Sequence, residues 1–200
     1  MLINGVPGVQ NNPDSQPVLL RAGKQGELSV SELHGKYYEQ TYRGNVFSLN
    51  TQGTNVTTTA ALATTWTGLG FANPAGSGVN AVLLAFGATQ FAVGAASTIG
   101  ILGAAGAITS TLTPQSRVIG GGAVSKMNGS AGATISTPLL IATFGSVGSV
   151  ATTSIPLVNG IYVDIAGLII VPPGSFIATY TSIVTTSALN FQFVWEEVAI

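Results

Sequence analysis

The end of the chain, Gly160–Ile200, reads GIYVDIAGLIIVPPGSFIATYTSIVTTSALNFQFVWEEVAI and decides the fold class. From Gly160 to Val171 the apolar residues recur with period two, which is the repeat of a β-strand. One face of this strand would carry Ile161, Val163, Ile165, Ile169 and Val171, and the other Tyr162, Asp164, Ala166, Leu168 and Ile170. Pro172-Pro173-Gly174 ends the strand, because proline has no N–H to donate and glycine accepts a positive φ.

Two further runs in the same stretch alternate in the same way. In the first, Phe176, Ala178 and Tyr180 alternate with Ile177, Thr179 and Thr181; in the second, Phe191, Phe193 and Trp195 lie opposite Gln192, Val194 and Glu196. We therefore expect three strands that together make the core of an antiparallel sheet. The aromatic face of the last strand should be buried.

Composition limits both the fold and the function. A chain of 200 residues suits one domain, or one domain with an arm. Only 6% of its residues are charged, against about 25% in a typical domain. There are two interpretations. Uncharged polar side chains of Ser, Thr, Asn and Gln make the surface hydrophilic, or much of the surface is buried in subunit contacts. We favour the second. A net charge of −1 provides no field for nucleic acid, and the absence of cysteine excludes disulfides and thiolate metal sites.

Residues 1–16 read as an irregular arm, because glycine, proline, asparagine and aspartate punctuate them. We expect residues 17–200 to form a single domain after this arm. The first residues have no basic segment followed by an apolar run, so we do not expect a signal peptide.

The segment Ser29–Arg43 admits two structures. Ser29 and Glu32 fit a capping box for a short helix, whereas the run Tyr37–Tyr42 has the composition of a strand, which we favour narrowly. A cluster of aromatic and basic residues here predicts a contact with a protein partner, made by Tyr37, Tyr38, Tyr42 and Arg43 beside Lys36. Core packing is the alternative. Binding of a nucleic-acid strand is disfavoured, because Glu32 and Glu39 cancel the positive charge.

Between Gly44 and Ser116 there is no charged residue. Residues 80–108 are long enough for a membrane span, but polar side chains interrupt them, glycine and alanine dilute them, and no Lys or Arg lies close by. We expect buried strands instead, at Ala81–Phe86, Gln90–Gly94 and Thr98–Leu102. Thr54–Phe71 suits a strand or strand edge with Trp66 and Phe71 as anchors.

The remaining segments complete an all-β pattern. Thr113–Gly132 reads as a loop, whereas Ala133–Phe144 and Ile155–Val158 regain strand character. Some eight to ten short strands with turns between them predict an antiparallel β-sandwich or jelly roll.

No catalytic pattern emerges from the sequence, so we expect a protein that is not an enzyme and holds no cofactor or metal. His34 is the one histidine and has no nucleophile in sequence context. Glu196 and Glu197 should point to opposite faces of a strand. Glu197 falls on the aromatic face, where it is either a buried, paired carboxylate or exposed past the edge of the sheet, which is the interpretation we favour. Gly76–Ala81 matches the loose dinucleotide pattern G-x-G-x-x-A but lacks the flanking strand, helix and acid.

The segment Glu27–Leu49 (ELSVSELHGKYYEQTYRGNVFSL), the uncharged body and the closing FQFVWEEV resemble structural proteins of tailed bacteriophage particles. The likeness is greatest to small jelly-roll proteins that decorate or cement the capsid. It implies a protein of the virion that forms homo-oligomers, often trimers, and binds the major capsid protein or another virion protein. From the low charge and the interrupted apolar run we expect neither nucleic acid nor a membrane as partner. Alternatives are a head-fibre or tail protein, or a carbohydrate-binding adhesive jelly roll that uses exposed Trp66 or tyrosines.

Overall fold

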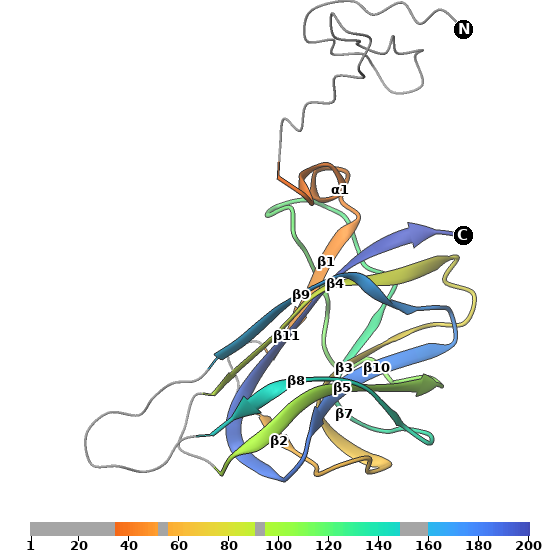
Figure 1. The fold of residues 1–200 in the computed structure, drawn as a ribbon. Coiled ribbons are helices and arrows are strands. Elements are labelled where there is room, and N and C mark those ends of the chain that lie inside the picture. Colours follow the sequence, from red (N-terminus) through yellow and green to blue (C-terminus); the bar gives the residue numbers. More distant parts are fainter. Residues whose placement is uncertain (1–34, 52–55, 91–94, 149–159) are drawn as a thin grey trace, which may run out of the picture. The chain divides into compact units, whose positions relative to one another are not determined.

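The computed structural model describes residues 35–51, 56–90, 95–148 and 160–200. Within these ranges it has one short helix and eleven strands (Figure 1): α1 (Tyr38–Tyr42), β1 (Val46–Asn50), β2 (Val56–Thr58), β3 (Thr65–Asn73), β4 (Val79–Gln90), β5 (Ser97–Ala105), β6 (Gln115–Ser116), β7 (Asn128–Thr134), β8 (Leu139–Val147), β9 (Gly160–Val171), β10 (Ser175–Thr181) and β11 (Thr185–Ala199). The described residues up to Glu39 belong to one compact unit, and Gln40–Ile200 form a second unit that holds all the strands.

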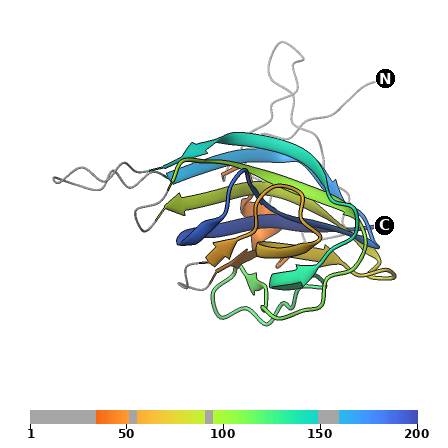
Figure 2. The same cartoon turned by 90° about the horizontal axis from the view of Figure 1, so that it is seen from below.

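The strands form two antiparallel sheets that pack face to face (Figures 1 and 2). One sheet has the order β6-β1-β11-β4-β9, with β2 also paired to β11; the other has the order β7-β3-β10-β5-β8. Their main strands, β1-β11-β4-β9 and β3-β10-β5-β8, follow the strand order of a jelly roll. The prediction of an all-β antiparallel sandwich is confirmed.

The three strands expected from the end of the chain are present, but they do not form one sheet. β9 and β11 lie in the same sheet with β4 between them, and β10 lies in the other sheet. The connections from β9 to β10 and from β10 to β11 cross between the sheets. A period-two pattern indicates a strand and its buried face, and it carries no information on which sheet receives the strand.

The main core lies between the sheets and is built on the aromatic residues of β11. Phe191, Phe193 and Trp195 are buried, as expected. The Trp195 ring stacks on Phe71 of β3, with the ring centroids 4.4 Å apart, and Phe193 meets Phe71 edge-on at 5.7 Å. These ring contacts join the two sheets at the centre of the sandwich.

A second, smaller core lies on the opposite face of the β10 sheet, where Ile108 and Ile135 pack with Trp66 and Phe176. Trp66 is fully buried, and its indole N–H donates to the Thr179 carbonyl at 2.9 Å. Its predicted role as an anchor is confirmed. Its alternative use as an exposed sugar platform is wrong, because the loops after β5 and β7 cover this face.

Three boundaries differ from expectation. Ala81–Phe86 and Gln90 belong to one continuous strand, β4, because Gly87 stays extended within it and does not break it. Thr113–Gly132 contains β6 and most of β7. Ala133–Phe144 divides at a turn between β7 and β8. Ile155–Val158, residues 91–94, His34 and the arm 1–16 lie outside the described residues.

The prediction of a strand over Tyr37–Tyr42 is wrong, because Tyr38–Tyr42 form the helix α1. Gly35 precedes the helix and accepts a hydrogen bond from the Tyr38 N–H at 2.9 Å. At the other end Gly44 takes a φ of +77° and donates to Thr41. Glycines at both ends bound a helix too short for its periodicity to be read from the sequence.

Asn73 at the end of β3 connects the sheets through its side chain. Its amide nitrogen donates to the carbonyls of Val79 in β4, at 2.8 Å, and Val171 in β9, at 2.9 Å. The residue is completely buried. One side chain from the β3 sheet therefore satisfies two strand ends of the other sheet.

Candidate functional site

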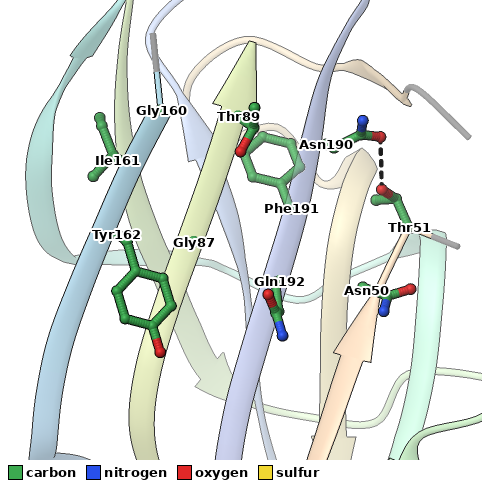
Figure 3. Close-up of a pocket in the computed structure, with 10 residues that line it drawn as sticks. All are labelled: Asn50, Thr51, Gly87, Thr89, Gly160, Ile161, Tyr162, Asn190, Phe191 and Gln192. Carbon is green, nitrogen blue, oxygen red and sulfur yellow. Dashed lines mark hydrogen bonds between the residues drawn. The ribbon is translucent and has the colours of Figure 1, made fainter. Parts of the chain in front are cut away.

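A shallow pocket lies on the outer face of the sheet that contains β9, β4, β11 and β1 (Figure 3). Four residues from these four strands are direct neighbours in the register: Tyr162 pairs with Gly87, Gly87 with Gln192, and Gln192 with Asn50. They form a row that crosses three strand spacings, or roughly 14 Å. We call Tyr162, Gly87, Gln192 and Asn50 the first row.

A second row runs beside the first, nearer the ends of the strands. Gly160 pairs with Thr89 and Thr89 with Asn190. The Thr51 hydroxyl donates to Asn190 Oδ1 at 2.9 Å, which is the dashed line in Figure 3. Both rows thus combine a glycine with hydroxyl and amide side chains.

Gly87 makes the depression at the centre of the pocket. A Cβ atom built on Gly87 would lie 3.5 Å from Cδ2 of Tyr162 and 3.7 Å from Cβ of Gln192. The missing side chain therefore leaves a space between an aromatic ring and an amide, and the whole pocket has a volume of about 470 Å³. The Tyr162 ring borders this space and is 68% exposed (Figure 3).

The chemistry of the pocket favours binding over catalysis. All ten lining residues lack a charged side chain. Its amides offer both N–H donors and carbonyl acceptors, its threonines offer hydroxyls, and Tyr162 offers an apolar ring face. Neutral hydrogen-bonding groups around an aromatic ring suit a polar ligand without charge.

A second surface feature is an apolar groove along the edge where β8 and β9 lie beside each other. Its sides are Leu139 and Ile141 of β8 and Leu168 and Ile170 of β9, and its volume is about 380 Å³. All four side chains are exposed, and Leu168 is the most exposed at 88%. We call these four residues the edge patch.

Both strands of this edge carry bulges. In β9 the pairing moves from Ala85–Asp164 to Leu83–Ile169, which leaves Ile165–Leu168 opposite Leu84. Within this bulge Ala166 and Gly167 have φ values of 53° and 85°. In β8 the register to β5 shifts twice, at Ile141 and at Phe144. Bulges of this kind interrupt the regular hydrogen-bonding edge that another strand would need.

The predicted contact residues include the first and last residues of the helix α1, Tyr38 and Tyr42, with Tyr37 just before it and Arg43 just after it in the sequence. Tyr38 and Tyr42 are 45% and 73% exposed, Arg43 is exposed and Tyr37 is half-buried. The Lys36 ammonium lies 4.9 Å from the centroid of the Tyr37 ring. Tyr37 and Tyr38 belong to the first compact unit, and Tyr42 and Arg43 to the second. The partner contact itself stays a prediction.

The two adjacent acids point to opposite faces, as expected, but Glu197 is not exposed past the sheet. Its carboxylate accepts hydrogen bonds from the Ser125 hydroxyl at 2.5 Å and the Lys126 N–H at 3.1 Å. The Trp195 indole N–H lies 3.4 Å from the same oxygen. Glu197 therefore holds the segment before β7 against β11. Burial raises the pKa of Glu196 above its ordinary value.

Sequence reasoning missed the first row as a site. It placed Tyr162 on the face opposite Ile161 and Val163 without saying which face is buried, and it placed Gln192 opposite the aromatic residues. The pairing of Gly87 with both was not readable, because it depends on β4 lying between β9 and β11.

Comparisons with family models, with curated proteins and with solved structures give no match for this chain. In the part of the chain that the structure describes, no helix has the length and apolar character of a membrane span. Among the same residues, no three His, Cys, Asp or Glu side chains gather as metal ligands would.

Proposed function

We propose that this chain is a structural protein of a bacteriophage particle, a decoration or cement protein that binds the head shell as a homotrimer. The proposed place in a phage particle rests on the resemblance of Glu27–Leu49 and the closing strand to virion proteins. The oligomer rests on the edge patch, which is the observation that carries the proposal. A head-fibre or tail protein would use the same kind of surface at another position in the virion.

The edge patch supports subunit contact through its composition. Leu139, Ile141, Leu168 and Ile170 are exposed side by side on two strands of a chain with only 6% charged residues. Strands that are apolar on both faces are typical of positions covered on both sides. A contiguous exposed apolar surface on a protein is most often a binding surface.

The bulges favour a contact through side chains. The interrupted backbones of β8 and β9 make a poor template for an added strand. Leu168 protrudes from its bulge beside the groove, so each subunit offers both a projecting side chain and a groove to receive one. A second copy of the same chain is therefore the occupant that we propose.

The oligomer is tested with the variant Leu168→Asp. Light scattering coupled to gel filtration should give the mass of a trimer for the unmodified chain and a lower mass for the variant, because a carboxylate would lose its water in the contact. Ile119→Asp is the matched control, since Ile119 is fully exposed and lies outside the edge patch. A monomeric unmodified chain at micromolar concentration would contradict the proposed oligomer.

The proposed place in the virion is tested separately, by a mass-spectrometric inventory of the proteins in purified virions. We expect the chain in the virion, and we expect added protein to sediment with heads that lack it. Absence from virions would refute the structural role whatever the oligomeric state.

A further inference from the structure

We propose that the pocket on the outer face of the β9-β4-β11-β1 sheet is a carbohydrate-binding site for neutral oligosaccharides built from pyranose rings. This inference goes beyond the proposed structural role and does not depend on it. It rests on the two rows of residues, on the depression at Gly87 and on the exposed ring of Tyr162.

A pyranose ring has two chemical sides that a site must match. Its C–H groups form an apolar patch that packs on an aromatic face, and its hydroxyls act as donors and acceptors around the rim. Tyr162 supplies the aromatic ring at one end of the first row. The Gly87 depression beside it gives room for a sugar ring to approach the sheet (Figure 3).

Hydrogen-bonding groups continue from the depression along both rows. Gln192 and Asn50 follow Gly87 in the first row, and Thr89 and Asn190 lie in the second. An amide can donate and accept at once, which suits a hydroxyl that does the same. Because the rows cross neighbouring strands, these groups recur at the strand spacing of about 4.8 Å. A linear chain of sugars laid across the strands meets such groups repeatedly.

The absence of charged side chains in the pocket favours neutral over anionic sugars. The ten residues that line the pocket include no acid or base. An anionic glycan would lose water from its carboxylates or sulfates here and gain no cation in return. Neutral oligosaccharides avoid this cost. The other occupant of such a surface would be a protein partner, and the experiment distinguishes the two.

Part of the site is held in place, which lowers the cost of binding. Thr51 and Asn190 fix each other by their hydrogen bond. The backbones of β4 and β11 are paired on both sides within the sheet. The Thr51 and Asn190 side chains and the strand backbones therefore have little freedom left to lose when a ligand binds.

The experiment screens the full chain against an array of neutral and acidic oligosaccharides and then titrates cellohexaose and chitohexaose by calorimetry. We expect a dissociation constant between about 10 μM and 1 mM for at least one neutral oligosaccharide. Tyr162→Ala should weaken binding at least about tenfold, whereas Tyr162→Phe should retain it because the ring face remains. Leu62→Ala is the control, since it removes another exposed large apolar side chain that lies outside the pocket.

Gly87→Val provides a second, independent variant. Valine favours strands and the built Cβ meets only ordinary van der Waals distances, so the fold should persist while the depression is filled. Binding should be abolished with an unchanged unfolding transition. No binding to any neutral oligosaccharide would overturn the proposal, as would binding that survives both Tyr162→Ala and Gly87→Val. Loss of particle binding in Gly87→Val without any sugar binding would also overturn it and assign the surface to a protein partner.

Discussion

Trp195 is the side chain on which the main core depends most. It is completely buried and stacks on Phe71 across the two sheets. Trp195→Ala should therefore lower the free energy of unfolding by about 3–5 kcal/mol, because it leaves a cavity that the opposed sheets cannot close. Denaturant titration measures the loss. Val198→Ala on the same strand is the control: Val198 is 40% exposed, and we expect a change within about 0.5 kcal/mol. A loss below about 1 kcal/mol for Trp195→Ala would show that the cavity collapses.

Glu196 should make stability depend on pH with an unusual sign. Burial raises its pKa above the ordinary value of 4.5. The folded state therefore binds the proton more tightly than the unfolded state, and stability falls as pH rises from about 4.5 through the raised pKa. The variant Glu196→Gln cannot ionise at this position, so its stability should not show this decrease with rising pH. Unfolding curves measured from pH 4 upward for both proteins test it. Parallel pH profiles would show that Glu196 ionises in the fold without cost.

At this scale the sequence predicted which side chains face inward, and it failed where a partner from another strand was needed. The alternation in β11 placed Phe193 and Trp195 in the core and Gln192 outside. Glu197 was expected to be exposed, because nothing nearby in sequence reveals that Ser125 and Lys126 come to its carboxylate. A hydrogen bond between residues 72 positions apart is a property of the topology.

At the scale of elements, Asn73 fixes the relation between the sheets. Asn73→Ala should cost about 1–3 kcal/mol, because it removes the amide donor from the buried carbonyls of Val171 and Val79, of which Val79 keeps a hydrogen bond from the Ser77 hydroxyl at 3.2 Å. Asn73→Asp should cost more, since a carboxylate would face both carbonyl oxygens. Asn80→Ala is the matched control on the adjoining strand, where the side chain is only half-buried. The measurement is the free energy of unfolding. Equal losses for Asn73→Ala and Asn80→Ala would contradict the role of Asn73 in joining the two sheets.

The elements themselves were predicted unevenly for physical reasons. β9, β10 and β11 were readable because apolar alternation and the Pro-Pro-Gly turn define them locally. Most of β7 was read as loop, up to Gly132, since a strand of Asn, Gly, Ser, Ala and Thr has no hydrophobic alternation. The short helix α1 was read as a strand, because tyrosine and threonine favour strands and five residues are too few to show a helical period.

At the scale of the whole molecule, the fold class could be predicted and the candidate site could not. Turn spacing and low helical periodicity are enough to indicate a sandwich. The two rows of the pocket require the strand order β9-β4-β11-β1, which brings Tyr162, Gly87, Gln192 and Asn50 together from four separate parts of the chain. No local pattern encodes that order.

The arm and the sandwich should have separate roles. Composition predicts that residues 1–16 do not fold alone, whereas the edge patch belongs to β8 and β9. If the proposed function holds, deleting Met1–Gln16 should therefore leave the proposed oligomer intact and weaken its attachment to the particle. Full-length and truncated protein, added to particles that lack it and then sedimented, give the occupancy of each. Equal occupancy would exclude a role for the arm in attachment, and a truncated monomer would assign the arm to subunit contact instead.

The pairing of β1 with β11 has a consequence for how the protein is made. Phe47 lies opposite Trp195 in the register, so β1 cannot pair with β11 until residues near position 195 have been synthesised. β4 likewise needs β11 along its length. Contacts between such distant parts of a chain form slowly, on a scale of milliseconds to seconds. A ribosome adds only about 5–20 residues per second. The apolar strands of the nascent chain therefore spend seconds outside the ribosome before the strand that completes their sheet has been synthesised.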